Sequence, residues 1–233
     1  MILSFETTNA RGHAVEHQTS AAAYPADVPA AEITLVLAHG AGAPQQSAFM
    51  VDFARALAER GIDVLTFNFL YTEQRRRIPD RTDMLEACYR AAVRAACEHF
   101  GRPAVFVGGK SMGGRIATHL AAADDAEAIG IKGVVLLGYP LHPPGKPEQL
   151  RTAHLPRIRV PTLIVQGERD AFGTPDELRP VIATMAAPVM LHVVTNGDHS
   201  LAPSRKRDAV AAAYHDIQDA IARWMSDADR SNS

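Results

Sequence analysis

The sequence predicts an α/β protein built on a mostly parallel central sheet with helices on both faces. Six short apolar runs, rich in β-branched residues, alternate along the chain with segments whose apolar residues recur at helical spacing. This alternation favours a parallel sheet. The runs are apolar throughout rather than alternately apolar and polar, which is typical of strands buried on both faces.

The first thirty residues are rich in polar side chains, and residues 2–7 and 12–17 within them could form two edge strands. The clear pattern starts at Ile33. Its six core strands are expected at residues 33–40, 63–69, 103–109, 133–140, 161–167 and 189–196. Five of these six runs end in glycine, proline or asparagine, residues that commonly end strands.

The helices are expected between these strands. They cover residues 47–61, 81–100, 111–123, 147–155, 174–185 and 205–225. Gly61 and Gly101 stand where a helix C-cap belongs. The last helix carries an apolar stripe formed by Val210, Tyr214, Ile217, Ile221 and Trp224. Residues 71–80 are polar and rich in arginine, so we expect a loop there.

The chain of 233 residues is long enough for one domain with a full core. No internal repeat or linker interrupts the pattern, so we expect a single domain over residues 1–233. Ligands of open α/β sheets bind outside the carboxyl ends of the strands. The residues that follow each strand are therefore the candidates for function.

Composition narrows the function classes. The net charge is −2, so no global basic field would hold nucleic acid. No apolar stretch approaches the ~20 residues that span a bilayer, and no signal peptide is visible. Cys88 and Cys97 are the two cysteines, nine residues apart in one expected helix; they point to opposite faces and cannot pair within it. We expect a cytoplasmic protein.

No metal or cofactor set is visible either. The chain has no H-E-x-x-H and no C-x-x-C pattern. We therefore expect chemistry that needs no metal and no cofactor.

Residues 109–113 fit the pattern G-x-S-x-G, between an expected strand and an expected helix. A sharp turn there would expose the hydroxyl of Ser111, and only glycine would fit two residues on either side of it. A phosphate-binding loop would need a further glycine at the position of Ala104. A glycine-rich turn that merely packs tightly is the other reading that this motif alone leaves open.

A serine nucleophile needs a base, and the base needs an acid to orient it. In this arrangement they follow the serine in the order acid, then histidine. Asp170 follows the strand at 161–167 and His199 follows the strand at 189–196, so we expect Asp170 as the acid and His199 as the base. Glu168 is the second candidate for the acid, and Asp198 is expected to be a solvated neighbour.

An oxyanion would need two backbone donors. The Met112 N–H lies at the start of the helix after Ser111. The second donor should come from the glycine-rich loop at 39–44, where Ala41 N–H is the first choice and Gly42 the next. His39 precedes Ser111 in the chain, so we expect it to brace this loop rather than act as the base.

Four segments in order, "AHGAG", "GGKSMGG", "GERDAFG" and "NGDHSL", resemble the α/β-hydrolase superfamily over nearly the whole chain. Within it the sequence is most similar to small dienelactone-hydrolase-like proteins, and to bacterial relatives of testis-expressed hydrolase-like proteins and of a chromatin-complex subunit. The segments 68–81 and 138–155 carry that second likeness. The resemblance implies the α/β-hydrolase fold, with Ser111 as nucleophile, Asp170 as acid and His199 as base.

The pocket is expected to be small and fairly open. About twenty residues with four prolines separate the strand at 133–140 from the next, which allows a stiff minimal cap and no lid domain. Candidate lining residues are Gly42, Tyr71, Tyr139 and His142, although ordinary packing is an alternative for each.

Arg75, Arg76 and Arg77 could dock a carboxylate or phosphate of the substrate. More often such a run of arginines is a solvated face or pairs with neighbouring acids, here Glu73 and Asp80. Lys110 adds positive charge beside Ser111 or forms a salt bridge. The role of these cations stays open.

The sequence as a whole indicates a serine hydrolase acting on esters or thioesters of small or medium acyl groups. Amidase or peptidase activity on the same three residues is one alternative. A non-catalytic interaction module, or a receptor that binds a small molecule without turnover, is another.

Overall fold

A computed structural model describes residues 1–8, 11–27, 32–102 and 104–231 of the chain. Its strands form one eight-stranded sheet in the order β1-β2-β4-β3-β5-β6-β7-β8. The strands are β1 (Ile2–Thr8), β2 (Ala14–Tyr24), β3 (Thr34–Ala38), β4 (Asp63–Phe67), β5 (Val105–Lys110), β6 (Ile131–Leu137), β7 (Thr162–Gly167) and β8 (Val189–Val194).

Strands β3 to β8 are parallel and correspond to the six expected core strands. The first position of the third expected strand, Pro103, lies outside the described residues. Strands β3 and β7 are fully buried, and β5 is buried up to Gly109, because helices cover both faces; this explains their apolar runs. The carboxyl ends of all six strands therefore meet at one edge of the sheet.

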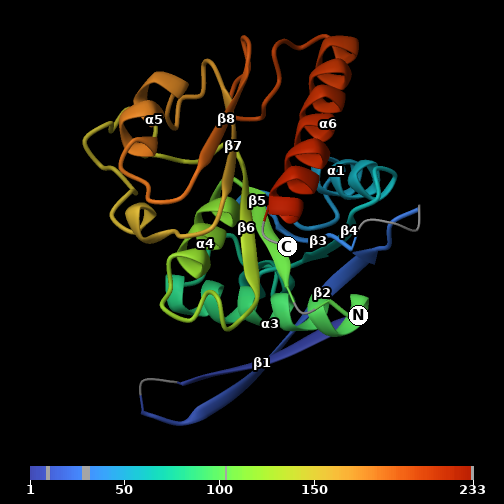
Figure 1. The fold of residues 1–233 in the computed structure, drawn as a ribbon. Helices are drawn as coiled ribbons and strands as arrows, with labels where there is room; N and C mark the ends of the chain where they lie inside the picture. The colour runs from blue at the N-terminus through green and yellow to red at the C-terminus, as the bar shows by residue number, and fades with distance from the viewer. Residues whose placement is uncertain (9–10, 28–31, 103, 232–233) are drawn as a thin grey trace.

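The α-helices cover the two faces of the sheet. They are α1 (Ala48–Ala58), α2 (Leu70–Glu73), α3 (Thr82–Phe100), α4 (Met112–Ala121), α5 (Pro175–Ile182) and α6 (Arg207–Ser231). Figure 1 shows α4 and α5 on one side of β6 to β8 and α6 on the other. The buried residues divide in the same way, one cluster lying under α3, α4 and α5 and the other under α1 and α6. This agrees with the predicted α/β architecture.

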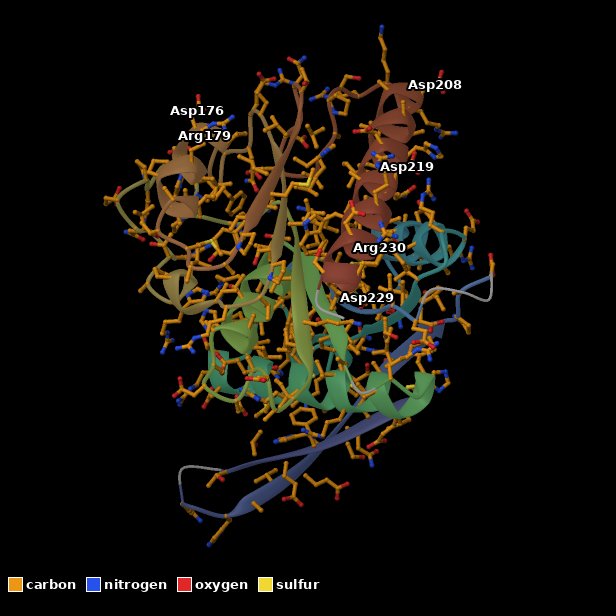
Figure 2. All side chains as sticks on the ribbon, viewed as in Figure 1. Asp176, Arg179, Asp208, Asp219, Asp229 and Arg230 are labelled. Carbon is orange, nitrogen blue, oxygen red and sulfur yellow. The ribbon has the colours of Figure 1, made fainter. Side chains whose placement is uncertain are left out.

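Local signals fix several helix ends. Gly101 ends α3 in a left-handed conformation with φ +65°. Thr174 and Glu177 form a reciprocal capping box at the start of α5. Arg60, just after α1, donates to Asp219 of α6 at 2.8 Å, so an ion pair joins the two helices of one face (Figure 2 labels Asp219).

The prediction of two edge strands at the N-terminus is half right. Strand β1 is an edge, but β2 pairs with β1 along residues 14–20 and with β4 along residues 21–24, both antiparallel. The expected strand ended at His17 and so left out the "AAAY" end of β2, which makes this second pairing. Figure 1 shows the hairpin as the dark-blue ribbon at one end of the molecule.

The expected helix over residues 147–155 is wrong. That stretch consists of turns and irregular backbone, and its last residue begins the short 3-10 helix η1 (Leu155–Arg157). The Arg151 N–H donates to Leu141 O at 2.8 Å and Arg151 O accepts from the Tyr139 hydroxyl, so this backbone bonds across an irregular cap instead of along a helix. Conversely, α2 lies at the start of the segment expected to be a loop. Within the described part of the chain, no helix is long and apolar enough to cross a membrane.

Candidate active site

Ser111 lies at the turn between β5 and α4, at the carboxyl edge of the sheet. Its φ is +51°, which non-glycine residues rarely adopt. A Cβ on Gly109 would stand 2.6 Å from Ala38 O, and one on Gly113 would stand 2.5 Å from the same oxygen. The turn therefore needs glycine on both sides of Ser111, as the sequence motif suggested.

The structure brings Ser111, His199 and Asp170 together although 88 and 29 residues separate them along the chain. Ser111 Oγ lies 2.9 Å from His199 Nε2. On the other side of the ring, His199 Nδ1 lies 2.8 Å from Asp170 Oδ2 and 3.0 Å from Oδ1. A carboxylate can only accept, so Nδ1 carries the proton and Nε2 is free to accept from the serine hydroxyl.

Asp170 is held in a buried, polar setting. Its carboxylate accepts from the Phe172 N–H at 2.8 Å and from Gln166 Nε2 at 2.9 Å, in addition to His199. The remaining groups of Gln166 contact Gly173 O and the Tyr139 N–H, so its amide is fixed. With these donors the carboxylate is satisfied despite being 1% exposed.

The two other acids considered for this role are engaged elsewhere. Glu168 accepts from the Asn196 N–H at 2.6 Å. Asp198 accepts from the Ser200 and Ala202 N–H groups and so shapes the loop that carries His199. Asp198 is thus a structural residue of the loop rather than a merely solvated neighbour.

The His199 loop lies close against the ends of β6 and β7. A Cβ on Gly167 would stand 2.3 Å from Asp198 O, so only glycine admits this approach. The ring of Phe172 stacks on the His199 ring with centroids 4.1 Å apart. Together these contacts restrict the imidazole to one orientation.

The Lys110 side chain lies against the loop that carries His199. Its Nζ donates to the His199 carbonyl at 2.5 Å, so it braces the histidine loop. Burial lowers the pKa of Lys110 to about 8, against the opposing attraction of Asp170 and Asp198. Within the described ranges of the chain Lys110 forms no direct salt bridge, but Asp170 and Asp198 lie close enough to act on its charge.

The loop after β3 reaches the nucleophile. A Cβ on Gly40 would stand 3.6 Å from Ser111 Cβ. The Tyr71 hydroxyl donates to Ala41 O at 3.0 Å, which fixes the loop peptide. The Met112 N–H opens α4, where the first N–H groups have no partner inside the helix.

His39 is buried and supports the same loop. Its Nε2 accepts from the Phe69 N–H at 3.1 Å, and its Nδ1 donates to Gly40 O at 2.7 Å. Burial lowers the pKa of His39, which favours this neutral form. His39 thus lies in the bracing position expected of it.

A cavity of about 410 Å³ opens beside Ser111 and His199. Its walls come from the loop after β3, from α1, from the His199 loop and from α6. The lining residues are Gly40, Ala41, Gly42, Ala43, Ser47, Phe49, Met50, Lys110, Ser111, Phe172, His199, Ser200 and Tyr214. Gly42, a predicted lining residue, is among them.

The three other predicted lining residues do not reach this cavity. The Tyr71 ring braces the Ala41 peptide and lines a separate hollow. The Tyr139 side chain is buried and its hydroxyl donates to Arg151 O. His142 is buried with its Nε2 3.3 Å from Glu177 Oε1. Tyr139 and His142 follow β6 where the chain turns inward, so both side chains point into the protein and away from this cavity.

The arginines of the segment after α2 make different contacts. Arg76 pairs with Asp80 at 2.5 Å. Arg77 joins Arg76 in lining the hollow next to Tyr71. Glu73, the other expected partner, instead accepts from Ser20 Oγ and Asn68 Nδ2.

Sequence reasoning missed several residues of the site. Gln166 had a signal, because it is a polar residue inside an otherwise apolar strand. Phe172 had none beyond its position two residues after Asp170. Phe49, Met50 and Tyr214 were hidden in helical apolar stripes, whose ends line the cavity.

Comparison with known proteins agrees with this geometry. The family model described as "Alpha/beta hydrolase domain" matches residues 31–226. The match includes Ser111, Asp170 and His199 and leaves out the whole N-terminal hairpin.

Three solved structures share the fold. An alpha-beta serine hydrolase homologue from Coxiella burnetii has a TM-score of 0.70 at 16% identity, covering 94% of this chain and 95% of that one. Dienelactone hydrolase from Anabaena variabilis has 0.66 at 17%, covering 94% and 96%. A serine hydrolase without lid from Xanthomonas campestris has 0.66 at 18%, covering 99% and 94%.

Proposed function

We propose that this chain, which belongs to the alpha/beta hydrolase domain family, is a serine hydrolase that cleaves carboxylic esters or thioesters of small or medium acyl groups. The observation that carries the proposal is the continuous contact from Ser111 Oγ through the His199 ring to the buried Asp170 carboxylate. In this proposal Ser111 is the nucleophile, His199 is the base that takes its proton, and Asp170 orients the base.

In the proposed reaction, Ser111 Oγ attacks the carbonyl carbon while its proton passes to His199 Nε2. The Met112 and Ala41 N–H groups stabilise the negative oxygen of the tetrahedral intermediate. His199 then gives the proton to the departing alcohol or thiol, which leaves an acyl group on Ser111. A water molecule, deprotonated by His199, releases the acid and restores the serine. Asp170 stays ionised and stabilises the imidazolium.

The size and cover of the cavity support small or medium substrates. A space of about 410 Å³ lies within the range of small-molecule sites. The cap between β6 and β7 is an irregular proline-rich segment, so no lid domain closes over the site. Amide and peptide bonds are the second class of substrate for the same residues, and the steady-state assay below separates them.

The test is steady-state hydrolysis of matched ester, thioester and amide substrates by wild type, Ser111→Ala, His199→Ala and Asp170→Asn. Removing any triad member lowers kcat by a factor of about 10⁴ or more in well-studied serine hydrolases. We expect losses of that order with circular dichroism unchanged. Near-normal rates in His199→Ala would contradict the assigned base. An absence of turnover on every substrate class would favour an interaction module or receptor.

A further inference from the structure

A second, smaller cavity opens on the other side of Ser111. It measures about 210 Å³ and shares Ser111 and Phe172 with the larger one. Of the two cavities, Met112 lines the second and His199 lines the larger one. The nucleophile thus separates two differently built spaces.

The second cavity is unusual in its charge. Two guanidinium groups line it, one from Arg115 on α4 and one from Arg151 in the cap. Within the part of the chain that the structure describes, the Arg115 side chain makes no hydrogen bond or ion pair. Among the same described residues, the Arg151 side chain makes one hydrogen bond, a long one of 3.4 Å to Pro140 O. Neither cation therefore has a carboxylate partner among the residues that the structure describes.

The one acid that lines this cavity is already neutralised. Asp80 accepts from Arg76 and from the Tyr71 N–H, at 2.5 and 2.8 Å. On the neighbouring helix α3, Asp83 lies 3.4 Å from Arg81, and Glu86 lies 2.9 Å from His119 Nδ1. These three acids are thus already engaged by partners other than Arg115 and Arg151.

The electrostatic surroundings agree with an uncompensated positive cluster. Burial, followed by the like charge of Arg151, lowers the pKa of Arg115. Burial also lowers the pKa of His154 to about 3, with His119, Arg115 and Arg157 as further causes. Two half-buried like charges are unfavourable alone, and an anion between them would relieve the repulsion.

The position of the proton donor, His199, indicates which part of the substrate enters the second cavity. His199 must protonate the leaving group, so the alcohol or thiol lies on the His199 side, in the larger cavity. The acyl chain then extends past Met112 toward Arg115 and Arg151. Guanidinium forks suit carboxylates and phosphates, which accept two parallel hydrogen bonds.

We propose that Arg115 and Arg151 form an anion subsite for the acyl chain, so that the preferred substrates are esters or thioesters whose acyl group ends in a carboxylate or phosphate. This inference rests on the proposed function and names its substrate class. The larger cavity, with its apolar walls from α1 and α6, receives the leaving group.

The test compares 4-nitrophenyl esters of straight-chain diacids from glutarate to suberate with neutral esters in which a methyl ketone replaces the free carboxylate. Phosphonate-ended esters form a second arm and identify which anion fits. We expect wild type to favour one charged length over its neutral match by about tenfold or more in kcat/KM, the size of a charge-assisted hydrogen bond.

Variants assign the preference to the two arginines. Arg115→Gln and Arg151→Gln should each lower the charged-to-neutral ratio about tenfold, and Arg115→Lys should restore part of it, because the charge stays and the fork is lost. Arg157→Gln removes an equal charge from the same cluster without touching the cavity and should leave the ratio unchanged.

Failure of this inference differs from failure of the proposed function. Ser111-dependent hydrolysis with no preference for charge at any length would overturn the subsite and leave the hydrolase standing. An equal loss in Arg157→Gln would also overturn it, since a general field would then suffice. If wild type turns over no ester, calorimetric titration of Ser111→Ala with adipate and with inorganic phosphate decides. Binding lost in Arg115→Gln supports the subsite, and no binding contradicts it.

Discussion

Ser111 holds a backbone conformation that side chains other than glycine rarely adopt, with φ +51°. Such strain costs on the order of 1 kcal/mol and persists where the surrounding structure enforces it. Here the glycines at 109 and 113 and the start of α4 enforce it. The strain aims the hydroxyl at His199.

We therefore expect the Ser111→Gly variant to be more stable than the Ser111→Ala variant by about 1 kcal/mol in free energy of unfolding. Glycine adopts this φ without strain, whereas alanine does not. Urea unfolding of both variants measures the difference. The matched control is Ala212→Gly on an exposed turn of α6, where the same change should cost about 1 kcal/mol. A loss of stability at position 111 equal to that at 212 would contradict the strain.

Lys110 gives a pH-dependent prediction. Its pKa is about 8 in the folded protein and near the ordinary 10.5 when unfolded. Between these values the unfolded state binds more protons, so the contribution of Lys110 to stability rises with pH and is least favourable below pH 8.

The comparison is wild type against Lys110→Met in urea unfolding at pH 7 and pH 10, with circular dichroism as the probe. We expect wild type to gain stability relative to the variant on going to pH 10, since the other titrating groups cancel in the difference. A constant difference, or one that moves in favour of Lys110→Met, would contradict the lowered pKa of Lys110.

At this scale the sequence could indicate the three residues proposed for catalysis. Ser111 has a motif, and the order of Asp170 and His199 after consecutive strand ends is set by the topology. Phe172 and the Tyr71 contact with Ala41 could not be inferred, because they depend on how loops pack and carry no pattern of their own. Tyr139 was misplaced for the same reason.

At the scale of elements, Tyr89 of α3 fastens a helix to the strand that carries the nucleophile. Its buried hydroxyl accepts the Gly108 N–H at 2.8 Å and lies 2.6 Å from Gly108 O and 2.8 Å from Val36 O. Backbone groups of β3 and β5 are thus satisfied by one side chain of a covering helix.

Tyr89→Phe should lower the free energy of unfolding by about 1–3 kcal/mol, because it leaves the Gly108 N–H buried without a partner. Tyr214→Phe is the control, since that hydroxyl donates to Ser200 O at the protein surface. Thermal and urea unfolding should show a clearly smaller effect for Tyr214. Equal losses of unfolding free energy in the two variants would mean that the Tyr89–Gly108 hydrogen bond adds nothing to stability.

The core strands were predictable because burial on both faces leaves an apolar run that few other elements produce. The prediction of the six parallel strands is confirmed by their pairing. Two elements were not predictable. The second pairing of β2 depends on partners distant in sequence. The cap at 147–155 has helix-forming residues, but the backbone of Arg151 bonds to Leu141 and to the Tyr139 hydroxyl, contacts that no local pattern predicts.

At the scale of the molecule, the N-terminal hairpin and the candidate site are separate. Three strands, β2, β4 and β3, lie between β1 and the nucleophile strand β5. Leu3 and Phe5 of β1 are nonetheless buried in the cluster under α3. The hairpin therefore contributes to stability without contributing to the site.

Phe5→Ala should cost about 3–5 kcal/mol of stability, as for other buried phenylalanines. At a temperature where the variant stays folded, ester turnover per folded molecule should equal that of wild type. The measurements are urea unfolding and steady-state kinetics on one preparation. A change in KM at full folding would show that the hairpin communicates with the site.

The central claim is that Ser111 is an activated nucleophile, and covalent labelling by a fluorophosphonate tests it most directly. The purified protein is incubated with the probe, and intact mass followed by peptide mapping locates the adduct, with Ser111→Ala as control. The account predicts one adduct on Ser111 that is absent from the variant. A folded wild type that gains no adduct, or one that is labelled equally in Ser111→Ala, would contradict it.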